Sequence, residues 1–203
     1  QSFDGASIQF RTSNAGELVS QGLEADFTWL PSVDGLTVYG AVSILDAAFS
    51  DSFTPTPPDG VSDPAVLALY DLDGQSTSGA ADFALNAGLD YSAPMDGGLE
   101  WGFGLNASYS DEYETQNEDP DGFVQDSFVL LNARAFVGAQ DGKWRVSVSG
   151  RNLNDELYVV TTGDRPFADT SNNTLKPGGI GQGDLVLNYA RGRQVFLEFE
   201  VRM

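Results

Sequence analysis

The sequence predicts an all-β fold, namely a transmembrane antiparallel β-barrel of about eight strands. Three observations lead to this prediction. Apolar and polar residues alternate over long stretches of the chain. These stretches are about 10–14 residues long, whereas strands of soluble domains usually have about five or six residues and a tilted bilayer-crossing strand needs about 9–11. The connections between the stretches are short and long by turns.

The alternation is clearest in LEWGFGLNASY, which begins at Leu99. Its odd positions carry Leu, Trp, Phe, Leu, Ala and Tyr, and its even positions carry Glu, Gly, Asn and Ser, the period-2 pattern of a two-faced strand. FALNAGLDY, LEADFTW, KWRVSVSGR and QVFLEFEVRM repeat the pattern. Strands are therefore expected near 2–11, 17–29, 36–47, 79–92, 99–110, 125–139, 143–153 and 193–203. The apolar positions are expected to face lipid and the small or charged positions to face the lumen.

The connections alternate in length. Short turns follow the second, fourth and sixth expected strands, at 30–35, 93–98 and 140–142. Long segments follow the third, fifth and seventh, at 48–78, 111–124 and 154–192. Short turns at one rim and long loops at the other are typical of outer-membrane barrels, whereas a soluble sandwich has turns every 8–12 residues without this bias.

Composition excludes several function classes. The chain has 30 acidic and 10 basic residues, a formal charge of −20, and the bases are scattered, so nucleic-acid binding is not expected. It has no Cys and no His, which removes thiolate catalysis, cysteine-ligated zinc, serine triads and His-based metal sites. Enzymes that depend on these residues are therefore not expected.

Several segments resemble the TonB-dependent outer-membrane receptors. SQGLEADFTWLPSVDGLTVYGAVSILDAAFSD resembles a strand–turn–strand unit of that family, and DLDGQ at 71–75 resembles the segment before its next strand. The most specific match is SGRNLNDELYV at 149–159, with an Asn-Leu-x-Asp-x-x-Tyr pattern carried by Asn152, Leu153, Asp155 and Tyr158. The resemblance spans residues 1–203 and implies the C-terminal part of a 22-stranded barrel, without the plug domain.

The resemblance implies TonB-dependent uptake of a scarce nutrient, such as a siderophore, a vitamin or a glycan, in the bacterial outer membrane. It implies no enzymatic activity and no resident cofactor. The partners it implies are outer-membrane lipid, the remaining barrel strands and plug, the TonB complex through that plug, and a small-molecule substrate. Arg134, Arg145 and Arg151 would then lie against the plug or against lumen carboxylates. Two alternatives stay open: a complete eight-stranded structural or adhesive barrel, and an assembly module that pairs through its edge strands.

One expected loop, 111–124, is rich in acidic residues and has no basic one. Hard cations such as calcium take six to eight oxygen ligands, which such a cluster can supply; the other interpretation is a solvated loop tip. The candidate metal ligands are Asp111, Glu112, Glu114, Glu118, Asp119 and Asp121.

Aromatic residues also occur in the expected external loops. They are candidates for stacking on a substrate, although loop aromatics also serve to anchor the loops themselves. The candidate substrate contacts are Tyr70, Tyr113, Phe123, Tyr158 and Phe167.

Overall fold

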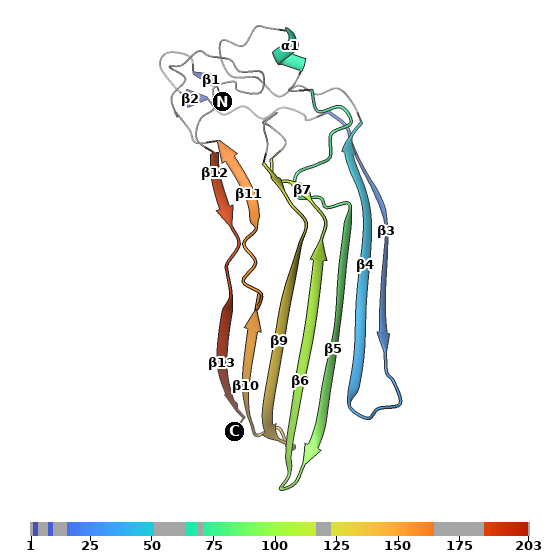
Figure 1. Cartoon of the computed structure of the whole chain (residues 1–203), viewed down its shortest axis with the longest axis vertical. Helices are drawn as coiled ribbons and strands as arrows, with labels where there is room; N and C mark the ends of the chain where they lie inside the picture. The colour runs from blue at the N-terminus through green and yellow to red at the C-terminus, as the bar shows by residue number, and fades with distance from the viewer. Residues whose placement is uncertain are drawn as a thin grey trace.

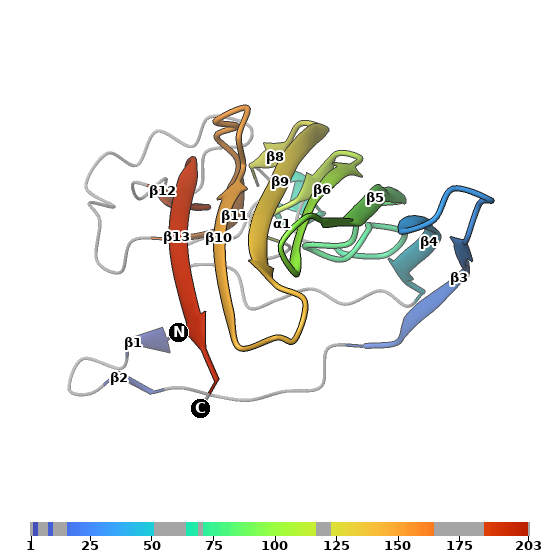
Figure 2. The ribbon, with the colours of Figure 1, turned by 90° about the horizontal axis from the view of Figure 1, so that it is seen from below.

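The main element of the fold is a seven-stranded antiparallel sheet (Figure 1). The computed structural model describes residues 2–3, 8–9, 16–50, 64–68, 71–116, 123–164 and 185–202. The sheet order is β13-β10-β9-β6-β5-β4-β3, so β3 and β13 are its two edges (Figure 2). The strands are β3 (Leu18–Trp29), β4 (Leu36–Phe49), β5 (Phe83–Met95), β6 (Leu99–Ser110), β9 (Phe128–Ala139), β10 (Trp144–Arg151) and β13 (Gln194–Val201).

Short elements precede β3 or lie between the long strands. Three two-stranded pairs are β1 with β2, β7 with β8, and β11 with β12. Their bounds are Ser2–Phe3, Ile8–Gln9, Tyr113–Glu114, Val124–Gln125, Val159–Asp164 and Leu185–Tyr189. A single helical turn, α1, spans Pro64–Leu67. Among the described residues, no helix has the length and apolar character to cross a membrane.

The predicted alternation of connections is confirmed. The turns that join β3 to β4, β5 to β6 and β9 to β10 lie at one end of the sheet (Figure 1). The elements α1, β7, β11 and β12 lie at the other end, which we call the loop end. The opposite end is called the turn end.

The sheet has one apolar and one polar face, and no core of its own. Residues paired across neighbouring strands point to the same face, so apolar residues lie beside apolar ones, as in the row Leu89, Leu105 and Ala133. Of the described hydrophobic residues, only Ala47, Leu72 and Val159 are buried. Large apolar side chains are open, including Trp29 at 60% and Leu197 at 80% exposure. An apolar face of this extent requires a cover outside the described chain.

Aromatic rings gather on the apolar face near the turn end. The Tyr91 ring lies 5.6 Å from that of Trp101 and 5.8 Å from that of Phe103. Trp29 and Trp144 also lie beside short turns, so all three tryptophans of the chain are at this end. This is the position of an interfacial aromatic girdle.

The expected first strand, near 2–11, differs from the structure. Ser2–Phe3 pairs with Ile8–Gln9, and neither segment joins the seven-stranded sheet. The intervening sequence contains the turn dipeptide Asp4-Gly5, which favours a short hairpin over a continuous strand. The expected connection 154–192 also differs, because it contains β11 and β12.

Several glycines make room for large side chains of neighbouring strands. A Cβ added to Gly102 would lie 2.5 Å from the Phe136 ring and 2.6 Å from the Tyr91 carbonyl oxygen. A Cβ added to Gly88 would lie 2.5 Å from the Tyr39 ring. The rings of Phe136 and Tyr39 thus lie directly on the backbone of the neighbouring strand at these two glycines.

The segment after β10 turns through two left-handed residues, Asn152 with φ of 51° and Asp155 with φ of 59°. The Asn152 side chain accepts the Glu156 N–H at 2.8 Å and donates to the Glu156 carbonyl at 2.8 Å. Asp155 accepts the Arg193 backbone N–H at 2.8 Å and lies 3.3 Å from the Arg193 guanidinium. The residues of the Asn-Leu-x-Asp pattern therefore end β10 and turn the chain.

Replacing Gly102 with Ala is expected to destabilise the sheet by about 1–3 kcal/mol, because the new methyl group overlaps both a ring and a backbone carbonyl. The temperature at which the folded band disappears on a semi-native gel measures this loss. Gly163→Ala is the matched control, since an added Cβ there meets nothing within 4 Å. Equal melting temperatures for the two variants would contradict the packing described.

The Asp155 turn is expected to weaken in acid. The Arg193 N–H and guanidinium hold the pKa of Asp155 below its usual range. Its contribution to stability is therefore complete above the ordinary value of about 3.9 and is lost as pH falls through the lower folded-state pKa.

Amide exchange at Arg193, relative to the intrinsic rate at each pH, measures this effect. Protection is expected to fall below about pH 4 in the native chain and in the control Glu156→Gln. Asp155→Asn, which lacks the charge, is expected to have lower and pH-independent protection. A similar acid-induced fall in Asp155→Asn would assign the effect to another group.

Candidate functional site

The polar face carries a ladder of side-chain amides near the loop end. Asn86 of β5 donates to the Ser108 hydroxyl at 2.7 Å, and Asn106 of β6 donates back to the Asn86 oxygen at 3.0 Å. Asn132 of β9 donates to the Asn106 oxygen at 3.2 Å and accepts the Asn152 backbone N–H at 3.0 Å. The ladder thus connects three adjacent strands to the turn after β10.

Ion pairs bridge glycines farther toward the turn end. Asp90, Gly104 and Arg134 are cross-strand neighbours in that order, and Arg134 reaches across Gly104 to Asp90 at 2.9 Å. A Cβ on Gly104 would overlap the Asp90 carboxylate, so the glycine keeps this path open. The side chains of Arg134 and Asp90 are partly exposed, so this ion pair contributes modestly to stability.

The second pair repeats this arrangement on the next strands. Glu100, Gly138 and Arg145 are neighbours, with a 2.7 Å contact between the end residues. The Arg145 guanidinium also lies 4.3 Å from the centre of the Phe136 ring. An acid, a glycine and an arginine in one cross-strand row is therefore a repeated device of this face.

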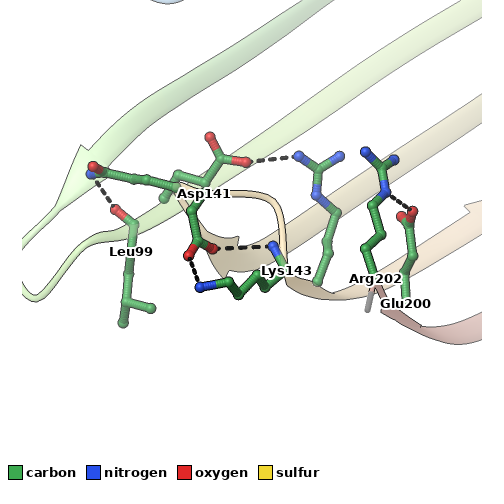
Figure 3. A network of polar contacts seen from close by, with 8 residues as sticks. Leu99, Asp141, Lys143, Glu200 and Arg202 are labelled. Carbon is green, nitrogen blue, oxygen red and sulfur yellow. Dashed lines mark hydrogen bonds and ion pairs between the residues drawn. The ribbon is translucent and has the colours of Figure 1, made fainter.

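Polar contacts also hold the turn end (Figure 3). Asp141 accepts the Lys143 N–H at 3.1 Å and pairs with its ammonium at 2.9 Å, which lowers the pKa of Asp141. Arg202 donates to Glu200 at 2.8 Å, and the Leu99 carbonyl accepts from the Gln140 side chain at 2.8 Å. The turn at 140–142 is thus held by side chains of its own residues.

A hollow of about 320 Å³ lies in the middle of the sheet, between the amide ladder and the first glycine-bridged ion pair. Its lining comes from four strands, β4, β5, β6 and β9, and from the end of β10. The polar groups of the lining are Tyr39, Asp90, Asn106, Asn132, Arg134, Ser149 and Arg151. Both donors and acceptors are present, which suits a small polar ligand group.

Buried polar groups connect two strand pairs at the loop end, β7 with β8 and β11 with β12. We call this group of contacts the clamp. The Tyr113 hydroxyl donates to the Val159 carbonyl at 2.7 Å, and the Val159 N–H donates to the Gln125 side chain at 2.7 Å. The Thr115 and Thr162 hydroxyls lie 2.9 Å apart. Val159 is 1% exposed, and Thr115, Gln125 and Thr162 are also buried, so this clamp is the most enclosed part of the described chain.

The candidate substrate aromatics have different surroundings. The Tyr158 ring stacks on Phe128 with centroids 4.2 Å apart, and Tyr113 lies edge-on to the same ring at 6.4 Å. Burial raises the pKa of Tyr113, and Tyr158 raises it further. The rings of Tyr158 and Tyr113 therefore pack against Phe128 within the loop end. Phe123 is 37% exposed, and its backbone carbonyl accepts a hydrogen bond from the Thr115 hydroxyl. Tyr70 and Phe167 lie outside the described residues.

The candidate metal ligands are only partly described. Asp111 accepts the Glu112 N–H at 3.0 Å and the Tyr109 hydroxyl at 3.3 Å, and burial raises the pKa of Glu114. In the described part of the chain, no three acidic side chains converge on a common point that could hold a metal ion. Glu118, Asp119 and Asp121 lie outside the described residues, so calcium binding by this loop stays a prediction.

The DLDGQ segment is a turn that packs on the end of β4. The Asp73 N–H donates to the Asp71 carboxylate at 3.2 Å, and Gly74 has a φ of 76°. The Gly74 N–H donates to the Phe49 carbonyl at 2.9 Å, and Leu72 is 4% exposed. The acidic residues thus shape a turn of the loop end.

Sequence reasoning missed the amide ladder and the clamp. It expected Arg134 and Arg145 to lie against the plug or lumen carboxylates, and their ion pairs confirm lumen carboxylates as partners, although the glycines between the partners were not foreseen. Arg151, expected in the same role, contacts no carboxylate among the described residues. Asn86 and Asn106 were assigned to the polar face, but their contact depends on a cross-strand register that alternation does not specify. Nothing in the sequence near Gln125 or Thr162 indicates that the two residues are buried.

Comparisons with known proteins agree with this architecture. A family model described as TonB dependent receptor-like, beta-barrel matches residues 1–153, well over half of the chain. The ferric yersiniabactin uptake receptor FyuA from Yersinia pestis is similar at 14% identity and a TM-score of 0.65, over 93% of this chain and 24% of that one. FpvAI in its complex with pyocin S2 is similar at 16% identity and a TM-score of 0.52, over 90% of this chain and 19% of that one.

The chain thus spans a quarter or less of the length of these two solved structures. No curated protein matches it. The family match confirms the predicted outer-membrane location and the absence of an enzymatic role in the family. The chain belongs to the TonB-dependent receptor β-barrel family of the bacterial outer membrane.

Proposed function

We propose that the chain supplies strands and external loops of a receptor for TonB-dependent uptake of a scarce nutrient: a siderophore, a vitamin or a glycan. The observation that carries this proposal is the two-faced sheet. Its apolar face lacks a cover among the described residues, and its polar face holds paired charges, amides and a hollow. A sheet of this kind fits between lipid and a polar lumen.

The open edges favour a larger barrel over a complete eight-stranded one. Closure into an eight-stranded barrel would need a strand near residues 2–11 to pair with both edge strands, β3 and β13. In the described residues, Ile8–Gln9 pairs with Ser2–Phe3, β13 pairs with β10, and β3 pairs with β4. An unpaired backbone group in hydrocarbon costs several kcal/mol, so both edges need further strands.

The further strands and the plug are parts of the proposed receptor. Membership in the receptor family favours pairing of the edges with these strands over pairing with a second copy of the chain. The first solved structure is named as a receptor for ferric yersiniabactin uptake. That name supports testing a ferric chelate first, with a vitamin and a glycan as the other two classes.

Deletion of the coding sequence in the source bacterium tests the proposal. The deletion strain is expected to lose growth on one limiting nutrient supplied as ferric chelate, cobalamin or oligosaccharide. A plasmid copy is expected to restore growth, as is the Gly163→Ala copy, and deletion of TonB is expected to reproduce the loss. Undiminished, TonB-independent uptake of all three nutrient classes would contradict the proposal.

A further inference from the structure

The central hollow has an excess of positive charge. Two guanidinium groups, those of Arg134 and Arg151, line it, and among the described residues Asp90 is the only carboxylate in its lining. Arg134 already donates to one Asp90 oxygen through two nitrogens, at 2.9 and 3.2 Å. The charge of Arg151 is therefore not balanced within the hollow.

Arg151 differs in this respect from the other arginines of the polar face. Arg134, Arg145 and Arg202 each contact a carboxylate within 3.0 Å. Arg151 forms no ion pair with any described residue, and its guanidinium lies over the Phe196 ring, 5.8 Å from the ring centre. Its side chain is exposed on the polar face.

The position of Arg151 favours a ligand that arrives from outside the cell. It is the last residue of β10, directly before the turn at Asn152 that begins the loop end. A ligand that passes the loop-end hairpins reaches this guanidinium before it reaches Arg134, which lies farther along the sheet toward the turn end.

The chemistry of the hollow selects a carboxylate. A guanidinium presents parallel N–H donors that match the two oxygens of a carboxylate, and such charge-assisted bonds are stronger than neutral ones. The hollow also contains the hydroxyl groups of Ser149 and Tyr39, and the Tyr39 hydroxyl lies against Gly88. A cationic group would meet two guanidinium groups there and would be repelled.

We infer that Arg151 recognises a carboxylate of the imported ligand in this hollow. This inference rests on the proposed uptake function and narrows its ligand to a carboxylate-bearing molecule. The carboxylate accepts hydrogen bonds from the N–H edge of the Arg151 guanidinium, which donates to no residue of the described chain, beside Ser149 and Asn132.

Titration calorimetry tests the inference. The purified receptor that contains this chain is titrated with citrate as the probe at low ionic strength. Saturable citrate binding is expected. Arg151→Gln is expected to weaken it by about tenfold or more, as for loss of a charged hydrogen bond. Arg151→Lys, which keeps the charge without the planar donors, is expected to retain part of the affinity.

Arg191→Gln is the matched control, because Arg191 is exposed, lies outside the hollow and forms no ion pair with a described residue. It is expected to leave citrate affinity unchanged. The unfolding temperature of each variant separates lost binding from lost structure, and Arg151→Gln is expected to unfold at the native temperature.

Three results would overturn the inference: no saturable citrate binding by the native receptor, equal weakening by Arg151→Gln and Arg191→Gln, or unchanged citrate affinity with a lowered unfolding temperature in Arg151→Gln. The last would assign the guanidinium to an acidic side chain of the receptor itself. Citrate binding through Arg151 in a protein whose deletion affects no nutrient uptake would contradict the proposed function and leave the binding site intact.

Discussion

Backbone hydrogen bonding between neighbouring strands is the constraint on which the rest of this structure depends. A bilayer interior offers no partner for an N–H or C=O group, so a spanning segment must satisfy them by pairing with other strands. The seven long strands do so in one continuous ladder from β3 to β13. Such a sheet needs no apolar core, and among the described hydrophobic residues only three are buried.

The same ladder places the polar groups. Because side chains alternate strictly across each strand, one register sets every contact on a face. Asp90, Gly104 and Arg134 share a row, and so do Glu100, Gly138 and Arg145. A one-residue slip of β9 would turn Arg134 toward lipid and away from Asp90, and an isolated charge is costly there. Register and polar pairing therefore support each other, and the central hollow is a consequence of that arrangement.

The long strands could be predicted from the sequence because their pattern is regular. LEWGFGLNASY alternates throughout, and β6 spans Leu99–Ser110. The expected strand near 2–11 was wrong because the interior Asp4-Gly5 dipeptide outweighs its few apolar residues. β11 and β12 were missed because they have only six and five residues and lie inside a long connection.

The contacts of the candidate site were less predictable, because they join residues far apart in the chain. The Tyr113 hydroxyl meets the Val159 carbonyl across 46 positions, and no local pattern indicates that pair. Arg134 and Asp90 are 44 positions apart, and their pairing depends on the glycine between them. Composition and alternation assign residues to a face, whereas partners on that face require the register.

Adjacent labels on β10 test most directly that the apolar face meets lipid. Val146 and Ser147 are neighbours on opposite faces of an interior strand, so single cysteines at these positions carry a matched pair of environment-sensitive fluorophores. In bilayers of brominated lipid, quenching is expected at position 146 and not at position 147. Quenching at 147 with none at 146, or equal quenching at both, would contradict the two-faced sheet on which this account is built.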